Sequence, residues 1–285
     1  MSNSNYKEKL ISIFIIFTLI TIAFIGLLVF EGIVDNGGAD AATLTVGPEQ
    51  TYSTIGDAIT AASMGDTIRV YAGTYNENVV INKKISLIGN GSANTTINGG
   101  GSGDVVNITA NGVNIIGFTI TNSSSTGYAG IIIFSSDYCK IENCRCLNNY
   151  NGIRLISSSW NKFLNNTCSL NIRFGFDLTS SSNNMIINNS CISNNDDGIY
   201  IEYSSNNILN GNNISNSIGD DGIHLHFTSN NIITNNTIKS NLNYGIVLNP
   251  SSSNTITNNT CLNNNAGILL FPSSNSNNIE NNNCS

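Results

Sequence analysis

Both histidines of this chain stand two residues apart, in the segment His224-Leu225-His226. In an extended strand, residues two apart project from the same face, so the two imidazoles are expected side by side. Imidazole nitrogens coordinate copper and zinc, and they also exchange protons near neutral pH. The segment is therefore a candidate for metal binding or for acid–base chemistry.

Carboxylates gather around this segment. The consecutive pairs Asp196-Asp197 and Asp220-Asp221 each precede a glycine, and carboxylates stacked in this way could bind calcium. Glu202 is expected one coil away from the histidines, where it could complete a copper or zinc site. The candidate metal ligands are His224, His226, Glu202, Asp196, Asp197, Asp220 and Asp221. These residues do not single out one ion, and calcium, copper and zinc stay open.

A tyrosine and an arginine extend the set of chemically capable residues. A lyase or C5-epimerase acting on uronate polymers needs a base at C5, an acid for the leaving group or the opposite face, and a group that neutralises the carboxylate. His224 or Tyr200 could be the base or the acid, and Arg154 could bind the carboxylate. Hydrolysis of a glycosidic bond by paired aspartates is a further alternative.

Two interpretations without chemistry compete with these. One is a carbohydrate-contacting face on which aromatic rings stack against sugars while acids and amides bind hydroxyl groups. Its candidate residues are Arg154, Asp177, Tyr200, Glu202, His224 and His226. The other is a solvated polar face, on which neighbouring acids repel each other only mildly because water screens them. Whether the protein is an enzyme stays open.

A repeat must position all of these residues. Seven copies of the pattern Gly, apolar, variable, Ile or Leu begin at Gly130, Gly152, Gly175, Gly198, Gly222, Gly245 and Gly267. Subtracting neighbours gives spacings of 22, 23, 23, 24, 23 and 22 residues, and such a period indicates a solenoid. Each copy has room for three short strands, and stacked copies pair in parallel at roughly 4.8 Å. The candidate residues therefore fall on about four neighbouring coils of one face.

Aligning the copies separates core columns from turn columns. One apolar column is Ile141, Phe163, Ile186, Leu209, Ile233, Ile256 and Ile279, and a second is Cys146, Cys168, Cys191, Ile214, Ile238, Cys261 and Cys284. Cysteine in such a column acts as a small core residue, although Cys139 and Cys144 with Cys146 leave a metal or disulfide role open. Two asparagine columns are expected in the turns: Asn161, Asn184, Asn207, Asn231, Asn254 and Asn277, and Asn143, Asn165, Asn188, Asn235, Asn258 and Asn281. The repeated glycine is expected to have a positive φ or to allow close backbone approach.

These repeats resemble right-handed parallel β-helix proteins of the pectate-lyase-like and NosD-like kind. Residues 51–89 resemble the N-terminal segment of that family, in which a short helix, here about Thr54–Ala62, caps the stack. The resemblance covers about residues 43–285 and implies an all-β, single-stranded, right-handed parallel β-helix of about ten coils of 22–24 residues. For the NosD-like branch it also implies copper handling.

A shorter resemblance concerns one candidate residue. The segment FGFDLT at Phe174–Thr179 resembles the YGFDPH motif of mannuronan epimerases, although the proline and the histidine of the motif are absent. This resemblance implies that Asp177 is catalytic. The full candidate catalytic set is then Asp177, Arg154, Tyr200 and His224.

The N-terminal region carries an apolar run, Leu10–Phe30, that is long enough to span a bilayer. Lysines precede it and acids follow it, which favours a cytoplasmic N-terminus and a β-helix outside the cytoplasm. The expected organisation is a cytoplasmic n-region at 1–9, a transmembrane anchor or signal segment at 10–30, a linker at 31–42 and the β-helix domain at 43–285. The domain is expected to be membrane-anchored or secreted.

The charge of the chain excludes some partners. Its net charge of −7, with seven acids against Lys239 alone from Phe174 onward, argues against nucleic acid binding. The expected partners are a polysaccharide or surface glycan, the membrane through the N-terminal segment, and a partner chain at the last coil. The sequence thus favours a cell-surface or secreted binding or structural module, with a lyase or epimerase and a copper-binding protein as alternatives.

Overall fold

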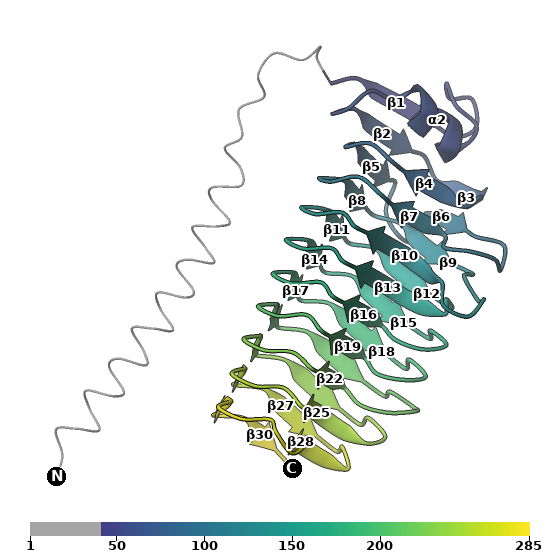
Figure 1. Ribbon diagram of the computed structural model, residues 1–285. Coiled ribbons are helices and arrows are strands. Elements are labelled where there is room, and N and C mark those ends of the chain that lie inside the picture. Colours follow the sequence, from purple (N-terminus) through teal and green to yellow (C-terminus); the bar gives the residue numbers. More distant parts are fainter. Residues whose placement is uncertain (1–40) are drawn as a thin grey trace, which may run out of the picture. The chain divides into compact units, whose positions relative to one another are not determined.

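The structure, a computed structural model, describes residues 41–285. Their strands stack as successive coils, and each complete coil gives one strand to each of three parallel sheets (Figure 1). The sheets hold 11, 10 and 9 strands, so the prediction of a parallel β-helix is confirmed and the predicted ten coils are close to the observed number. Within residues 41–285, no helix is long and apolar enough to cross a membrane. The n-region, the apolar run and most of the linker lie outside the described residues.

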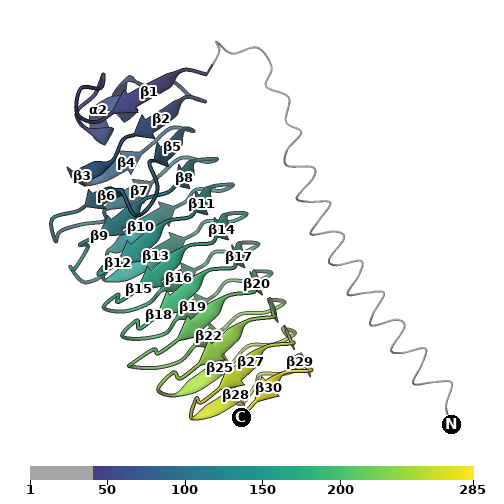
Figure 2. The same cartoon turned by 180° about the vertical axis from the view of Figure 1, so that it is seen from behind.

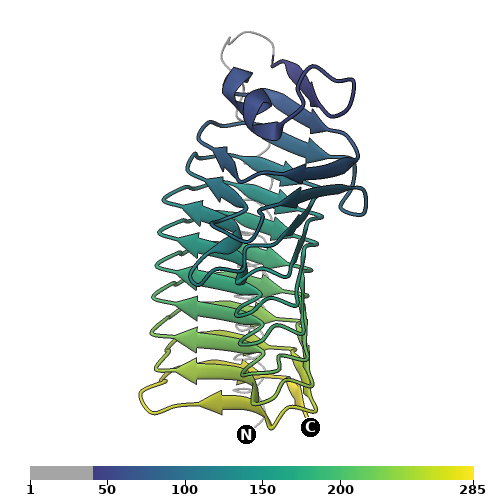
Figure 3. The same ribbon diagram turned by 90° about the vertical axis from the view of Figure 1, so that its right-hand side faces the viewer.

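The strands of each sheet follow one another at intervals of one coil, as the views from behind and from the side show (Figure 2, Figure 3). The first sheet contains β1 (Thr43–Val46), β2 (Thr67–Val70), β5 (Ser86–Gly89), β8 (Asn114–Ile116), β11 (Lys140–Glu142), β14 (Lys162–Leu164), β17 (Met185–Ile187), β20 (Ile208–Asn210), β23 (Ile232–Thr234), β26 (Thr255–Thr257) and β29 (Asn278–Glu280). The second contains β3 (Gly73–Asn76), β6 (Thr95–Asn98), β9 (Thr119–Thr121), β12 (Arg145–Leu147), β15 (Thr167–Ser169), β18 (Ser190–Ile192), β21 (Asn213–Ser215), β24 (Thr237–Lys239), β27 (Thr260–Leu262) and β30 (Asn283–Cys284).

The third sheet carries the repeated glycine pattern and the candidate functional residues. It contains β4 (Val79–Ile81), β7 (Val106–Ile108), β10 (Ala129–Phe134), β13 (Asn151–Ile156), β16 (Phe176–Thr179), β19 (Ile199–Glu202), β22 (Ile223–His226), β25 (Tyr244–Asn249) and β28 (Ala266–Leu270). A single short helix of the described residues, α2 (Ile55–Ala61), lies within the range expected for a helix. Its buried residues Ile55, Ala58 and Ile59 join the core beside β1, β2 and β4, and its capping role stays a prediction.

The two apolar columns fill the interior, as the alignment predicts. Every member of both columns is buried except Ile279 and Cys284, which belong to the last coil. Cys139 and Cys144 are buried too, and their backbone N–H groups donate to the side-chain oxygens of Asn161 and Asn166 in the next coil. All seven cysteines are free thiols, which agrees with their interpretation as core and turn residues.

Asparagine ladders tie the turns of successive coils together, but only one of the two predicted columns is such a ladder. In that column each backbone N–H donates to the Oδ1 of the next coil, beginning with Asn161 to Asn184 at 2.9 Å. The other predicted column has left-handed backbone conformations, with φ of 55° at Asn188. There the residue that follows, such as Asn189, forms the ladder. A left-handed residue turns the chain so that its successor points inward.

The repeated glycines permit close approach of neighbouring coils. A Cβ atom on Gly175 would lie 2.5 Å from the carbonyl oxygen of Gly198, and one on Gly152 would lie 2.5 Å from that of Gly175. None of the seven repeated glycines has a positive φ, so that part of the prediction is wrong. Asparagine and serine supply most of the left-handed conformations instead, and Tyr138, Trp160, Leu170, Tyr203 and Phe227 supply others.

Candidate functional site

The candidate residues occupy two rows on the outward face of four adjacent strands, β13, β16, β19 and β22. Strand register places Arg154, Asp177, Tyr200 and His224 in one row, and Ile156, Thr179, Glu202 and His226 in the other. The first row continues into Ile132 and Val247, which are only 8% and 1% exposed. The row is therefore buried where it continues beyond the candidate residues, and it is not a flat solvated wall.

The two rows together form a strip of outward-facing residues. Within this strip, Arg154 and Asp177 form an ion pair. The Arg154 Nε lies 2.9 Å from the Asp177 Oδ2, and the guanidinium also donates to the Gly127 carbonyl at 2.7 Å. The hydroxyl of Thr179 donates to the other oxygen of Asp177. Burial raises the pKa of Asp177, although the Arg154 charge opposes that effect. The arginine that could neutralise a uronate carboxylate already neutralises a carboxylate of the protein.

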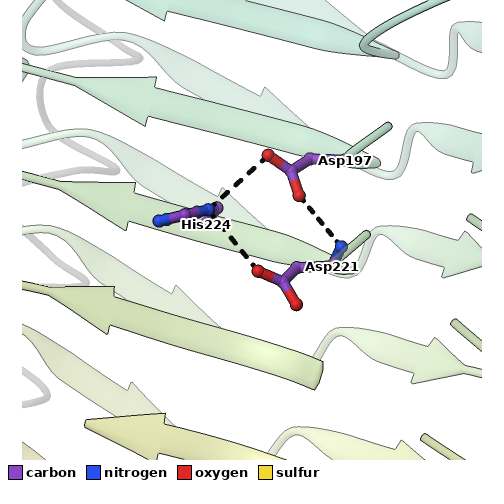
Figure 4. Close-up of side chains that lie close together, drawn as sticks. All are labelled: Asp197, Asp221 and His224. Atoms are coloured by element: carbon purple, nitrogen blue, oxygen red, sulfur yellow. Dashed lines mark hydrogen bonds and ion pairs between the residues drawn. The ribbon is translucent and has the colours of Figure 1, made fainter. Parts of the chain in front are cut away.

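Asp197, Asp221 and His224 converge on one point, and we call them the aspartate–histidine cluster (Figure 4). The His224 Nδ1 lies 3.7 Å from the Asp197 Oδ2 and 3.4 Å from the Asp221 Oδ2. Both remaining oxygens accept backbone hydrogen bonds, Asp197 from the Asp221 N–H and Asp221 from the Tyr244 N–H, each at 2.9 Å. These backbone bonds aim one oxygen of each aspartate at the imidazole.

The cluster carries more negative charge than its own residues neutralise. The aspartate side chains are 3% and 4% exposed, and in the part of the chain that the structure describes neither pairs with a lysine or an arginine. Burial, followed by the neighbouring Asp221 carboxylate, raises the pKa of Asp197 well above its ordinary value. Burial raises the pKa of Asp221 to about 7 and lowers that of His224. Buried carboxylates of this kind require a proton or a cation.

The other two aspartates of the consecutive pairs point to different partners. Arg173 Nε lies 3.4 Å from Asp196 Oδ2, and the Asn243 amide donates to Asp220 at 2.7 Å. Three carboxylate oxygens, one from each of Asp196, Asp197 and Asp220, still lie within 4.8 Å of one another. Asp197 thus belongs to two overlapping groups, a buried one with Asp221 and His224 and a more exposed one with Asp196 and Asp220.

Tyr200, Glu202 and His226 form a second group, the tyrosine–glutamate–histidine cluster. The His226 Nδ1 lies 3.1 Å from the Glu202 Oε1 and 3.0 Å from the Tyr200 hydroxyl. The Tyr200 ring stacks on Phe174 at 4.8 Å and meets the His224 ring edge-on at 5.4 Å. Burial, reinforced by the Glu202 carboxylate, raises the pKa of Tyr200, so the phenol stays protonated.

The structure therefore does not bring the seven candidate ligands to one point. Glu202 contacts His226, whereas His224 turns its Nδ1 toward the aspartates that precede the repeated glycines. The alternative of a solvated polar face is wrong for Asp177, Asp197 and Asp221, which are buried. Sequence reasoning missed Phe174, which stacks under Tyr200. Its position in the repeat could have pointed to it. The residues directly before a repeated glycine include Phe174, Asp197, Asp221 and Tyr244.

Known families match most of the described chain. Residues 59–231 match the family described as periplasmic copper-binding protein (NosD). The chain belongs to the NosD family. A second family, described as right handed beta helix region, matches residues 187–285. The two matches overlap within the coils that carry the NosD chain's candidate residues.

Solved structures similar to this NosD family chain share its fold. The catalytic domain of a GH87 alpha-1,3-glucanase in complex with nigerose has 18% identity and a TM-score of 0.65, covering 82% of this chain and 47% of its own. A mannuronan C-5 epimerase A-module from Azotobacter vinelandii has 20% identity and a TM-score of 0.59, covering 75% of each chain. An alginate lyase from Paenibacillus sp. has 15% identity and a TM-score of 0.51, and the match covers 85% of this chain and 99% of the lyase chain.

These structures establish the fold and leave the activity to the residues of the site. The chain spans about half the length of the glucanase domain. No curated protein matches the NosD family chain significantly.

Proposed function

We propose that this NosD family β-helix binds a divalent transition-metal ion at the aspartate–histidine cluster. The observation that carries the proposal is the convergence of two buried carboxylate oxygens on one imidazole nitrogen, without a lysine or an arginine among their ion-pair partners in residues 41–285. A divalent cation would balance both carboxylates. The family description as copper-binding supports the same conclusion.

The geometry favours a small ion over calcium. A tetrahedral ion with bonds of about 2.1 Å has ligand atoms about 3.4 Å apart. The His224 Nδ1 lies 3.4 Å and 3.7 Å from the two aspartate oxygens, and all three ligand atoms lie within 4.8 Å of one another. Calcium takes six to eight oxygen ligands, and this cluster offers two carboxylates and a nitrogen. Imidazole with carboxylate suits copper(II) or zinc, whereas thiolate would suit copper(I).

Calorimetric titration of the metal-free protein with copper(II), zinc and calcium tests this proposal. We expect saturable binding of copper(II) and zinc that becomes at least about tenfold weaker in His224→Gln and in Asp197→Asn, because each variant removes a ligand. Glu280→Gln, which changes an exposed carboxylate on the last coil, is the matched control and should bind as the wild type does. Equal affinities in all four proteins would refute the site.

The location of the domain belongs to the same proposal. We place the β-helix outside the cytoplasm, secreted or membrane-anchored. The family description as periplasmic supports this placement, together with the lysine-flanked apolar run Leu10–Phe30 in the sequence.

Saccharide binding with hydrolysis is the second candidate, and a specific spacing favours it. Three variants of the glucanase each replace one aspartate by alanine, and two of those aspartates follow the third by 23 and 24 positions. In this chain Asp220 and Asp221 follow Asp197 by the same 23 and 24 positions. A sugar on the strip would also meet the half-buried side chains of Tyr200, Glu202 and His226.

Incubation with α-1,3-glucan and with alginate separates this candidate from the metal site. If the protein hydrolyses the glucan, we expect new reducing ends and a cleavage rate at least about a hundredfold lower in Asp221→Asn. EDTA should have no effect on this rate. Unsaturated uronate products would instead indicate a lyase. If neither polymer is cleaved or retained by the protein, the saccharide candidate is dropped while the metal proposal stands.

A further inference from the structure

The tyrosine–glutamate–histidine cluster gathers three possible ligand atoms at one point, partly open to solvent. Two oxygens, Glu202 Oε1 and the Tyr200 hydroxyl, lie 3.1 Å and 3.0 Å from the same nitrogen, His226 Nδ1. Without an ion, hydrogen bonds join these groups, because the phenol both donates and accepts and the carboxylate accepts. A cation at this point would accept all three donor atoms together.

The cluster is also more accessible than the aspartate–histidine cluster. The side chains of His226 and Glu202 are 26% and 25% exposed, against 18% for His224 and 3% for Asp197. An ion held here would keep open coordination positions for water or for a ligand oxygen, because only the nitrogen and one carboxylate would be strong protein ligands.

Aromatic rings pack against two of the three donors, Tyr200 and His226. Phe174 stacks on Tyr200 at 4.8 Å, and Phe227 packs against His226 with ring centroids 4.3 Å apart. Tyr203 stacks on Phe227 at 5.4 Å with nearly parallel planes. Packing of this kind keeps ligand side chains in one orientation. Tyr200 and His226 are therefore held in position before an ion arrives.

We propose that Tyr200, Glu202 and His226 form a second, open cation site beside the aspartate–histidine cluster. The rings of His224 and His226 lie 6.0 Å apart, so the two ions would be close enough to repel each other. The buried site, with two carboxylates, fills first. The open site fills second and more weakly, and its free coordination positions can take an oxygen ligand from solution.

Equilibrium dialysis against zinc or copper(II), followed by elemental analysis, counts the ions. Two ions per wild-type chain are expected at saturation, with calorimetry resolving a tight and a weaker step. His226→Gln and Glu202→Gln should each lose the weaker step and keep the tight one. Tyr200→Phe, which keeps the ring and its stacking, should weaken the second step less than either.

The His224→Gln variant makes this test independent of the first proposal. It should lose the tight step and keep the step that His226→Gln abolishes. If His226→Gln removes a step that His224→Gln retains, the open site stands even when the buried one fails. One ion per wild-type chain, with an unchanged titration in His226→Gln and Glu202→Gln, would show that hydrogen bonds alone hold this cluster. Circular dichroism of each variant verifies that the β-helix is intact.

Discussion

Replacing Asn189 with alanine is expected to lower the free energy of unfolding by about 2–4 kcal/mol, since each buried polar group left unpaired costs about 1–3 kcal/mol. The Asn189 Oδ1 accepts hydrogen bonds from the backbone N–H and the side-chain amide of Asn166, at 2.8 Å and 3.0 Å. Its Nδ2 donates to the Phe163 carbonyl at 2.9 Å. Asn189 is 1% exposed, so water cannot replace these bonds. Chemical denaturation measures the loss.

The preceding residue supplies the matched control. Asn188 has a φ of 55°, and Gly211 occupies the equivalent position one coil later with a φ of 68°. Glycine adopts this conformation without strain, so Asn188→Gly should change stability by less than about 1 kcal/mol. Hydrogen exchange at the Asn166 amide should accelerate only in the Asn189 variant. Equal destabilisation by the two changes would contradict the assignment of the ladder.

The metal-free protein is expected to become less stable as the pH rises from about 4 to about 8. Burial raises the pKa of Asp221 from 3.8 to about 7, and it raises that of Asp197 as well. A carboxyl whose pKa is higher in the folded than in the unfolded state binds protons preferentially when folded. Its stabilising contribution is complete below the unfolded pKa and is lost as the pH rises through the folded pKa.

The expected loss is on the order of 2–4 kcal/mol, because each unit of pKa difference corresponds to about 1.4 kcal/mol and relaxation of the site reduces the total. His224 acts in the opposite direction, since its lowered pKa costs stability as the pH falls below its ordinary range. Urea unfolding in EDTA at several pH values measures how steeply the free energy of unfolding falls with pH. Asp221→Asn should reduce this slope, and zinc added in place of EDTA should flatten it. A slope identical in wild type and Asp221→Asn would show that this carboxyl is not the cause.

The coil architecture was predictable because it depends on one-dimensional spacing. The 22–24-residue period sets the register, and the register places Asp177, Tyr200 and His224 in one row without knowledge of any side-chain angle. The same logic predicts the buried columns and the cysteines within them. The second asparagine column also lies in turns, as expected, but spacing did not show that Asn188 is left-handed and that its successor Asn189 forms the ladder.

The sequence by itself therefore determined the β-helix, its core and the strip of polar residues, because all of these follow from a period. Only the tertiary structure decided how that strip divides. Arg154 is neutralised by Asp177, His224 faces Asp197 and Asp221, and His226 faces Glu202 and Tyr200. These pairings depend on side-chain torsions, on backbone N–H groups that hold single carboxylate oxygens, and on the burial of the acids. Residue spacing contains none of that information, and the pairings turn one row of candidates into two separate sites.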